Sequence, residues 1–236
     1  MQNSIDNHKI LKFLNASTAG LAILIDPDKE EVEGIPNLVK GLPVETTCVL
    51  VGGSRVEPGK SDLICKSIKL FTSLPVMLFP GDEKQLSSNV DAVLFLSLVS
   101  GRNPEFLINQ HVKAVPFLRK HALEVIPTAY LLIDGETRTA VREVTQTQPI
   151  PQDSVQLIVD TCLAAKFLGM QLIYLEAGSG AQKPVDLNII KKLKQEIDLP
   201  IMVGGGIRSL SLAKEYYKAG ARMVVVGTAY EQRTLK

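Results

Sequence analysis

Short apolar runs recur at regular intervals along the chain, bounded by glycine, proline and polar residues. Apolar runs of this length are typical of strands buried on both faces of a parallel sheet. The pattern predicts eight such strands: Leu21–Ile25, Thr47–Val51, Val76–Phe79, Ala92–Leu98, Glu124–Leu132, Leu172–Glu176, Ile201–Val203 and Met223–Val226.

Most of these runs are separated by segments with helical periodicity. In 153–168, for example, one helical face collects Val155, Ile158, Val159, Cys162, Leu163 and Phe167. The other clear helices are Ser61–Phe71 (apolar at Leu63, Ile64, Ile68 and Phe71), Leu187–Ile197 and Leu210–Ala219. Strands alternating with helices indicate a parallel sheet, and eight strands indicate closure into a barrel. The sequence therefore predicts an α/β fold, a (β/α)8 or TIM barrel, with residues 1–236 forming a single domain.

Two connections depart from this regular pattern. Only Pro80–Asp91 separates the third and fourth strands, which is too short for a crossover helix with both of its loops. We therefore expect the third outer helix to be missing or replaced. The polar segment Ile133–Gln152 after the fifth strand is predicted to be a long loop, and loops of this length are usually functional.

Composition narrows the class of protein. The 236 residues are 45% hydrophobic and 22% charged with a formal net charge of +1, which argues against a nucleic-acid-binding protein. The three cysteines, Cys48, Cys65 and Cys162, lack metal-ligand spacing and are expected to be buried thiols. We find no signal-like start and no apolar stretch long enough to span a membrane. A cytoplasmic protein with at most transient membrane contact is expected.

Three late segments end in small residues, chiefly glycine. They are IYLEAGSGA (173–181), IMVGGGIRS (201–209) and MVVVGTAYE (223–231). Glycine lets backbone amides approach an anion closely, and the last strands of a TIM barrel are where phosphate sites gather. As a set, these segments predict a phosphate cradle.

Glu176 ends an otherwise apolar strand, where a carboxylate is costly unless it has a role or a partner. Tyr174 lies two residues earlier and therefore points to the same side of the strand. Beside a phosphate cradle, Glu176 could act as a general base on a hydroxyl of the phosphate-bearing molecule. The alternative is a structural glutamate paired with a buried arginine.

The ends of the first two strands carry oxygen ligands suited to a hard cation. Asp26 in LIDPDKEE directly follows its strand and is a candidate Mg2+ ligand, although a turn role is the alternative. Asp28 is expected instead to cap a following helix. Ser54 in VGGSRVEPGK could bind metal or phosphate. The alternative is that the two glycines before it only form a turn. Arg55 and Lys60 are candidates for diphosphate contact or for ordinary surface charges.

The chain resembles the geranylgeranylglyceryl phosphate synthase family, including its heptaprenyl-using bacterial relatives. The resemblance rests on stretches in family order along nearly the whole chain: LIDPDK (24–29), VGGSRVEPGK (51–60), PVMLFPG (75–81), DAVLFLSLVSGRNP (91–104), IPTAYLLIDG (126–135), YLEAGSGA (174–181), VGGGIRS (203–209) and VVVGTAYE (224–231). It implies a modified TIM barrel whose third helix is replaced by a non-helical segment, in agreement with the short connection noted above.

The resemblance implies a Mg2+-dependent prenyltransferase that joins sn-glycerol 1-phosphate to a polyprenyl diphosphate through an ether bond. Asp26 and Ser54 would hold Mg2+, and Glu176 would be catalytic. The implied substrate-binding residues are Tyr174, Leu175, Glu176, Ala177, Gly178, Ser179, Gly180, Gly204, Gly205, Gly206, Gly227 and Thr228. The family also implies a homo-oligomer.

The donor chain length is less closely defined. Leu24 in LIDPDK resembles the subgroup that uses geranylgeranyl diphosphate, while heptaprenyl diphosphate is the alternative. Apolar candidates for the wall around the chain are Phe95, Leu96, Val99, Phe117 and Tyr130. Two other classes stay open: a phosphosugar isomerase or lyase, although no lysine lies within a predicted strand, and a non-catalytic phospholigand-binding protein.

Overall fold

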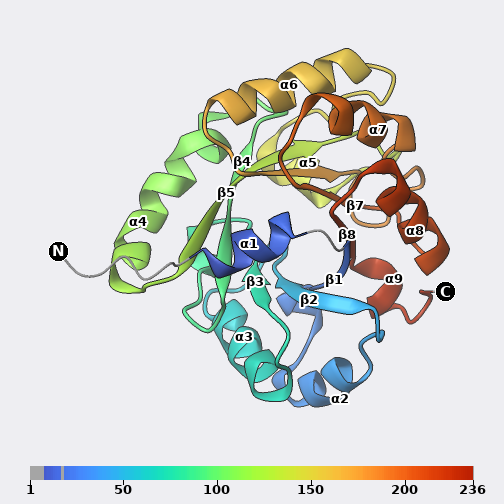
Figure 1. The fold of residues 1–236 in the computed structure, drawn as a ribbon. Helices are drawn as coiled ribbons and strands as arrows, with labels where there is room; N and C mark the ends of the chain where they lie inside the picture. Colours follow the sequence, from blue (N-terminus) through green and yellow to red (C-terminus); the bar gives the residue numbers. More distant parts are fainter. Residues whose placement is uncertain (1–7, 17–18, 236) are drawn as a thin grey trace.

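The computed structural model describes residues 8–16 and 19–235, and within them eight parallel strands form a closed barrel in sequence order (Figure 1). The strands are β1 (Gly20–Ile25), β2 (Thr46–Val51), β3 (Val76–Leu78), β4 (Ala92–Leu98), β5 (Glu124–Leu132), β6 (Leu172–Glu176), β7 (Ile201–Gly204) and β8 (Met223–Val226). The predicted fold class is confirmed, and every predicted strand end lies within one residue of the observed one.

Helices surround the barrel on its outside. They include α2 (Ile35–Lys40), α3 (Lys60–Phe71), α4 (Gln110–Lys120), α6 (Val155–Phe167), α7 (Leu187–Glu196), α8 (Leu210–Ala219) and the short α9 (Thr228–Glu231). The four predicted helices are all present. Three side chains assigned to apolar helical faces are in fact exposed, namely Leu63 (57%), Phe71 (53%) and Phe167 (80%). Phe71 and Phe167 are the last residues of α3 and α6.

The core has two layers because alternate residues of each strand point to opposite sides. On β6, Ile173 and Leu175 belong to the layer between strands and helices, whereas Leu172 and Tyr174 fill the barrel interior. Glu176 has the same parity as Tyr174, so its side chain belongs to the interior at the carboxyl end of the strand. The three cysteines are buried as predicted, and burial raises the pKa of each thiol to about 12.

Helix α1 (Lys9–Asn15) closes the amino-terminal end of the barrel and crosses the front of the view in Figure 1. Its Ile10 and Leu14 pack into the interior layer. Glu124, at the start of β5, accepts hydrogen bonds from the backbone amides of Ile10 at 2.8 Å and Leu11 at 2.7 Å. These bonds satisfy amide groups in the first turn of the helix that lack intrahelical partners.

The two irregular connections lie where the sequence predicts them. Between β3 and β4 the structure has the single turn η3 (Glu83–Gln85) in place of a crossover helix, so the missing third helix is confirmed. The segment 133–152 differs from the predicted loop, since it contains helix α5 (Ala140–Thr145). The Thr139 side chain caps this helix by accepting a hydrogen bond from the Arg142 amide at 3.2 Å. Six residues are too few to show helical periodicity.

No helix within the described residues is long and apolar enough to cross a membrane.

Candidate active site

The carboxyl ends of the strands surround a polar cavity of about 370 Å³. All three glycine-rich segments reach it, and so do the ends of β1 and β2. Its lining includes the predicted residues Asp26, Ser54, Glu176, Gly178, Ser179, Gly180, Gly205, Gly206, Gly227 and Thr228. The structure therefore brings together most of the predicted site.

Glu176 lies at the base of this cavity and is only 8% exposed. The Tyr174 hydroxyl donates to Oε2 at 2.9 Å, and the Gly178 amide donates to Oε1 at 2.8 Å. Burial raises the pKa of Glu176 to about 7, against the lowering effect of these two hydrogen bonds. The alternative of a buried arginine partner is wrong, because a hydroxyl and an amide take that place. A carboxylate with this pKa is well matched to proton transfer near neutral pH.

The glycine triplet gives Glu176 the space it occupies. A Cβ atom on Gly204 would lie 2.7 Å from Glu176 Oε2 and 2.8 Å from the Tyr174 hydroxyl. A Cβ on Gly205 would lie 2.7 Å from Glu176 Oε1 and 2.6 Å from the Gly178 nitrogen, and Gly205 has a φ of +86°. Both the contacts and the left-handed backbone therefore require glycine at position 205.

The predicted phosphate cradle, formed by the three glycine-rich segments, also includes hydroxyl side chains from two of them. The hydroxyls of Ser179 and Thr228 are 2.9 Å apart, so the ends of β6 and β8 meet at this point. Arg208 also lines the cavity and donates to the Ala181 carbonyl at 2.9 Å. Sequence reasoning missed Arg208, although a cation two residues after the glycine triplet is a signal for an anion site.

Four predicted substrate-binding residues do not line the cavity. The side chains of Leu175 and Ala177 point into the outer core layer, because their parity is opposite to that of Glu176. The Ala177 amide is already bonded to the Gly204 carbonyl at 3.1 Å. Tyr174 and Gly204 lie beneath Glu176, where they position its carboxylate. We therefore exclude the Leu175 and Ala177 side chains from substrate contact.

Beside the β8 end of the cradle, a cluster of acidic and basic side chains joins the segment after β1 to helix α9. Lys29 Nζ is 2.9 Å from Glu231 Oε2 and 3.5 Å from Asp26 Oδ2, and all three residues line the cavity. Burial acts to lower the pKa of Lys29, but the hydrogen bonds and charges of Glu231 and Asp26 together outweigh this effect and raise the pKa.

The capping role assigned to Asp28 is wrong. Asp26 caps the short helix η1 (Pro27–Lys29) by accepting a hydrogen bond from the Asp28 amide at 3.2 Å, while Asp28 Oδ1 accepts one from the Glu57 amide at 3.2 Å. A proline directly after Asp26 favours this tight turn at the strand end.

Arg55 and Lys60, the candidates for diphosphate contact, are both outside the lining of the cavity. Arg55 lies 3.9 Å from Glu143, and Lys60 Nζ lies 3.5 Å from Glu31 and 3.4 Å from the Asp28 carbonyl.

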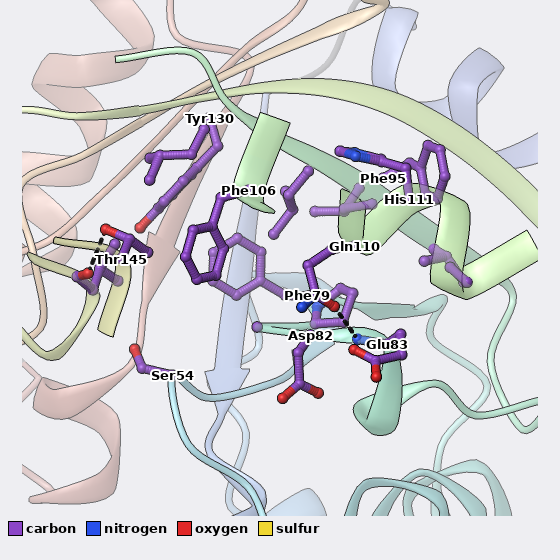
Figure 2. A pocket seen from close by; sticks show the side chains of 18 of the residues that line it. Ser54, Phe79, Asp82, Glu83, Phe95, Phe106, Gln110, His111, Tyr130 and Thr145 are labelled. Atoms are coloured by element: carbon purple, nitrogen blue, oxygen red, sulfur yellow. Dashed lines mark hydrogen bonds between the residues drawn. The ribbon is translucent and has the colours of Figure 1, made fainter. Parts of the chain in front are cut away.

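A second, mainly apolar cavity adjoins the first and extends between β3, β4 and α4 (Figure 2). The two cavities share Gly53, Ser54, Phe79, Tyr130 and Val141. In Figure 2, Ser54 and Thr145 lie at one end of this channel, and Phe95 and His111 lie at the other.

Of the predicted wall residues, Phe95, Leu96 and Tyr130 line the channel, whereas Val99 and Phe117 do not. Val99 packs against the outer core layer, and the Phe117 ring lies against His121 with centroids 4.4 Å apart. The sequence did not single out several other lining residues: Phe79, Leu98, Phe106, His111, Ala114 and Val141. Half of them come from α4 and α5, whose positions beside the short connection depend on the tertiary fold.

Phe79 and Tyr130 line both cavities where they join, and the buried ring of Tyr174 packs against them. The ring centroids of Phe79, Tyr130 and Tyr174 lie 5.1 to 5.7 Å from one another.

The fold and site together define a (β/α)8-barrel enzyme in which a glycine-lined cavity with a buried carboxylate adjoins a mainly apolar channel, an arrangement suited to a prenyltransferase. The chain belongs to the PcrB family, whose model matches residues 17–235. Among its relatives is the geranylgeranylglyceryl phosphate synthase of Zunongwangia profunda, 48% identical over 96% of this chain and 97% of that protein. The protein of the same name from Methanopyrus kandleri is 40% identical over 94% and 93%.

Solved structures agree with this assignment. The (S)-3-O-geranylgeranylglyceryl phosphate synthase of Thermoplasma acidophilum, in complex with its substrate sn-glycerol-1-phosphate, superposes with a TM-score of 0.85 and is 32% identical, covering 98% of this chain and 93% of that one. The thiamine phosphate pyrophosphorylase of Pyrococcus furiosus, 15% identical over 91% of each chain with a TM-score of 0.54, shares the fold alone.

The burial of Glu176 should be visible in the pH dependence of stability. Its pKa is raised from 4.5 to about 7 in the folded protein, so its contribution to stability is fully present below pH 4.5 and is lost as the pH rises through about 7. We expect Glu176→Gln to be more stable than the wild type at pH 8 by roughly 1–3 kcal/mol, and nearly equal to it at pH 4.5. Urea denaturation at both pH values measures this difference, and a pH-independent difference would contradict the shifted pKa.

Proposed function

We propose that this protein transfers the geranylgeranyl group of geranylgeranyl diphosphate to sn-glycerol 1-phosphate, releasing diphosphate and forming geranylgeranylglyceryl phosphate. The observation that carries the proposal is the junction of the two cavities. Ser54, Phe79 and Tyr130 line both the polar cavity that contains Glu176 and the apolar channel, so a phosphate-bearing alcohol and a prenyl chain can meet there. The Thermoplasma acidophilum relative, crystallised with sn-glycerol-1-phosphate, supports the choice of acceptor.

The cradle of glycines would hold the phosphate group of the acceptor. Glycines at the ends of β6, β7 and β8 line the polar cavity, as do Ser179 and Thr228, whose hydroxyls lie 2.9 Å apart. The Arg208 guanidinium adds a positive charge near the phosphate. This placement leaves the glycerol hydroxyls directed toward Glu176.

Glu176 would act on the C3 hydroxyl of the acceptor. As the hydroxyl oxygen forms a bond to C1 of the donor, the bond from C1 to the diphosphate oxygen breaks and its electron pair leaves with the diphosphate. The hydroxyl proton passes to the Glu176 carboxylate. The hydrogen bonds from Tyr174 and Gly178 keep that carboxylate oriented.

The residues on the β1 and β2 side fit a magnesium ion. Asp26 and Ser54 are hard oxygen donors that line the same cavity. Asp26 Oδ1 accepts the Asp28 amide at 3.2 Å, and Oδ2 lies 3.5 Å from Lys29 Nζ, so a cation bound by Oδ2 would lie beside the lysine. Within the described part of the chain no group of three or more His, Cys, Asp or Glu residues could hold a metal, so the remaining ligands would be diphosphate oxygens and water. A bound Mg2+ would neutralise charge that develops on the leaving diphosphate.

The decisive test of this function is product formation. Radiolabelled sn-glycerol 1-phosphate incubated with geranylgeranyl diphosphate and Mg2+ should enter an organic-extractable product, identified by mass as the ether. Heptaprenyl diphosphate offered in competition tests the donor length. Absence of a labelled organic product with either donor would contradict the proposed function.

Replacing Asp26 should affect the binding of the two substrates differently. We expect Asp26→Asn to raise the KM for the donor and for Mg2+ by roughly ten- to 100-fold, since a charged ligand is lost, and to leave acceptor affinity within about twofold. The asparagine Oδ1 can still accept the Asp28 amide, so the turn should persist. Steady-state kinetics and calorimetry with sn-glycerol 1-phosphate measure the two effects. An equal loss for both substrates would indicate a structural role for Asp26.

A further inference from the structure

The polar cavity has few positive charges of its own. Among the described residues that line it, the lysines and arginines are Lys29 and Arg208. Arg208 lies on the cradle side, where it donates to the carbonyls of Gly180 and Ala181. Lys29 is the basic residue on the side of Asp26 and Ser54, where the leaving group of the donor would lie.

The position of Lys29 is fixed by two acidic residues. Its ammonium is 2.9 Å from Glu231 Oε2 and 3.5 Å from Asp26 Oδ2. The Glu231 side chain is 14% exposed, whereas the Lys29 side chain is 50% exposed. The lysine therefore still presents part of its surface to the cavity and can donate further hydrogen bonds, since an ammonium has three protons.

We propose that Lys29 binds the diphosphate group of the prenyl donor directly and that Glu231 positions it for this contact. The inference rests on the proposed function. Asp26, Glu231 and a diphosphate are all anionic, so bringing the donor to this side of the mouth requires fixed positive charge. An ammonium supplies it, and charge-assisted hydrogen bonds to phosphate oxygens are among the strong ones.

The two carboxylates lie at unequal distances from the Lys29 ammonium, 2.9 Å for Glu231 and 3.5 Å for Asp26. A Mg2+ ion on Asp26 would repel the Lys29 ammonium from that carboxylate. Glu231, the nearer partner, would retain the lysine beside the metal site. Donor diphosphate would then meet Mg2+ on Asp26 and the ammonium on Glu231 together.

Glu231 also links the two substrate sites. It ends the four-residue helix α9 that begins at Thr228, whose hydroxyl lies 2.9 Å from that of Ser179 in the phosphate cradle. The lysine is thus held by the same short helix that forms part of the acceptor site.

The test is the binding of inorganic diphosphate by calorimetry, with and without Mg2+. We expect Lys29→Met to weaken diphosphate binding by about ten- to 100-fold in both conditions, and Lys29→Arg to restore part of it. Glu231→Gln should weaken binding less, mainly when Mg2+ is present, because the released lysine then competes for Asp26. Lys60→Met is the matched control, since it removes the same charge from a nearby lysine outside the cavity lining, and it should bind diphosphate as the wild type does.

Wild-type affinity for diphosphate in Lys29→Met, with or without Mg2+, would overturn the assignment, and so would an equal loss in Lys60→Met. Binding of sn-glycerol 1-phosphate to each variant, with thermal melting of the same samples, shows that the other site and the fold are intact. If the proposed reaction itself were wrong, the wild type would form no labelled ether. The failure of the proposed function can therefore be distinguished from the failure of the Lys29 assignment.

Discussion

Glu176→Gln should lower turnover by roughly two to four orders of magnitude, the scale of general base catalysis, while leaving the affinity for sn-glycerol 1-phosphate nearly unchanged. The amide cannot accept the hydroxyl proton. Its single oxygen can keep the hydrogen bond from the Gly178 amide, while its NH2 group can donate to the Tyr174 hydroxyl, which is able to accept as well as donate. Single-turnover kinetics at saturating donor isolates the chemical step, and calorimetry measures acceptor binding.

Tyr174→Phe is the matched variant for this experiment. The Tyr174 hydroxyl lowers the pKa of Glu176, so its removal should raise that pKa and shift the acidic limb of the rate profile to higher pH. The wild type should lose activity as the pH falls through about 7, because Glu176 becomes protonated. Near-normal turnover in Glu176→Gln, or an acidic limb that persists in it unchanged, would place the base elsewhere.

Gly205→Val should abolish the binding of sn-glycerol 1-phosphate, with affinity reduced by at least about 100-fold. Its Cβ would lie 2.6 Å from the Gly178 nitrogen and 2.7 Å from both the Ala177 nitrogen and Glu176 Oε1, so the cradle and the carboxylate must both move. The φ of +86° adds backbone strain of about 1–2 kcal/mol for any L-residue with a side chain. Calorimetry with the acceptor and thermal melting of the same sample measure the two consequences.

Gly34→Ala is a suitable control for this substitution, because a Cβ at Gly34 meets nothing within 4 Å and the site lies outside the cavity lining. Gly205→Ala keeps the strain but reduces the bulk, and it should bind the acceptor more weakly than the wild type while melting cooperatively. Unchanged acceptor affinity in a folded Gly205 variant would contradict the placement of the phosphate.

The barrel was predictable because its strands are buried on both faces. A run such as Ile201–Val203 has few alternatives to a central parallel strand, and Pro80–Asp91 is simply too short for a helix with two loops. Helix α5 escaped prediction because its six residues are stabilised by Thr139 and by packing rather than by a periodic pattern. The N-terminal α1 likewise depends on Glu124, more than 100 positions away along the chain.

The candidate site, too, could be predicted from the sequence only in part. Glu176, Asp26 and the glycines stand at strand ends, so parity and chain order were enough to bring them together. Leu175 and Ala177 were included because they belong to the same contiguous stretch, and strand parity excludes their side chains. The pair of Lys29 and Glu231 joins opposite ends of the chain, and no local pattern could have indicated it.

The short connection after β3 has a consequence for how the protein responds to its donor. Elsewhere an amphipathic helix covers the barrel wall, but beside η3 the apolar channel occupies part of that layer. A prenyl tail in the channel would bury hydrocarbon at a place where a regular (β/α)8 barrel buries the apolar face of a helix. The bound substrate would therefore supply part of the apolar core. Since a ligand that binds only the folded state stabilises it in proportion to its affinity, longer tails that fit the channel should raise the melting temperature stepwise. The diphosphate head should add the same increment for every donor, so the differences between chains would make thermal melting a gauge of how much of the channel each chain fills.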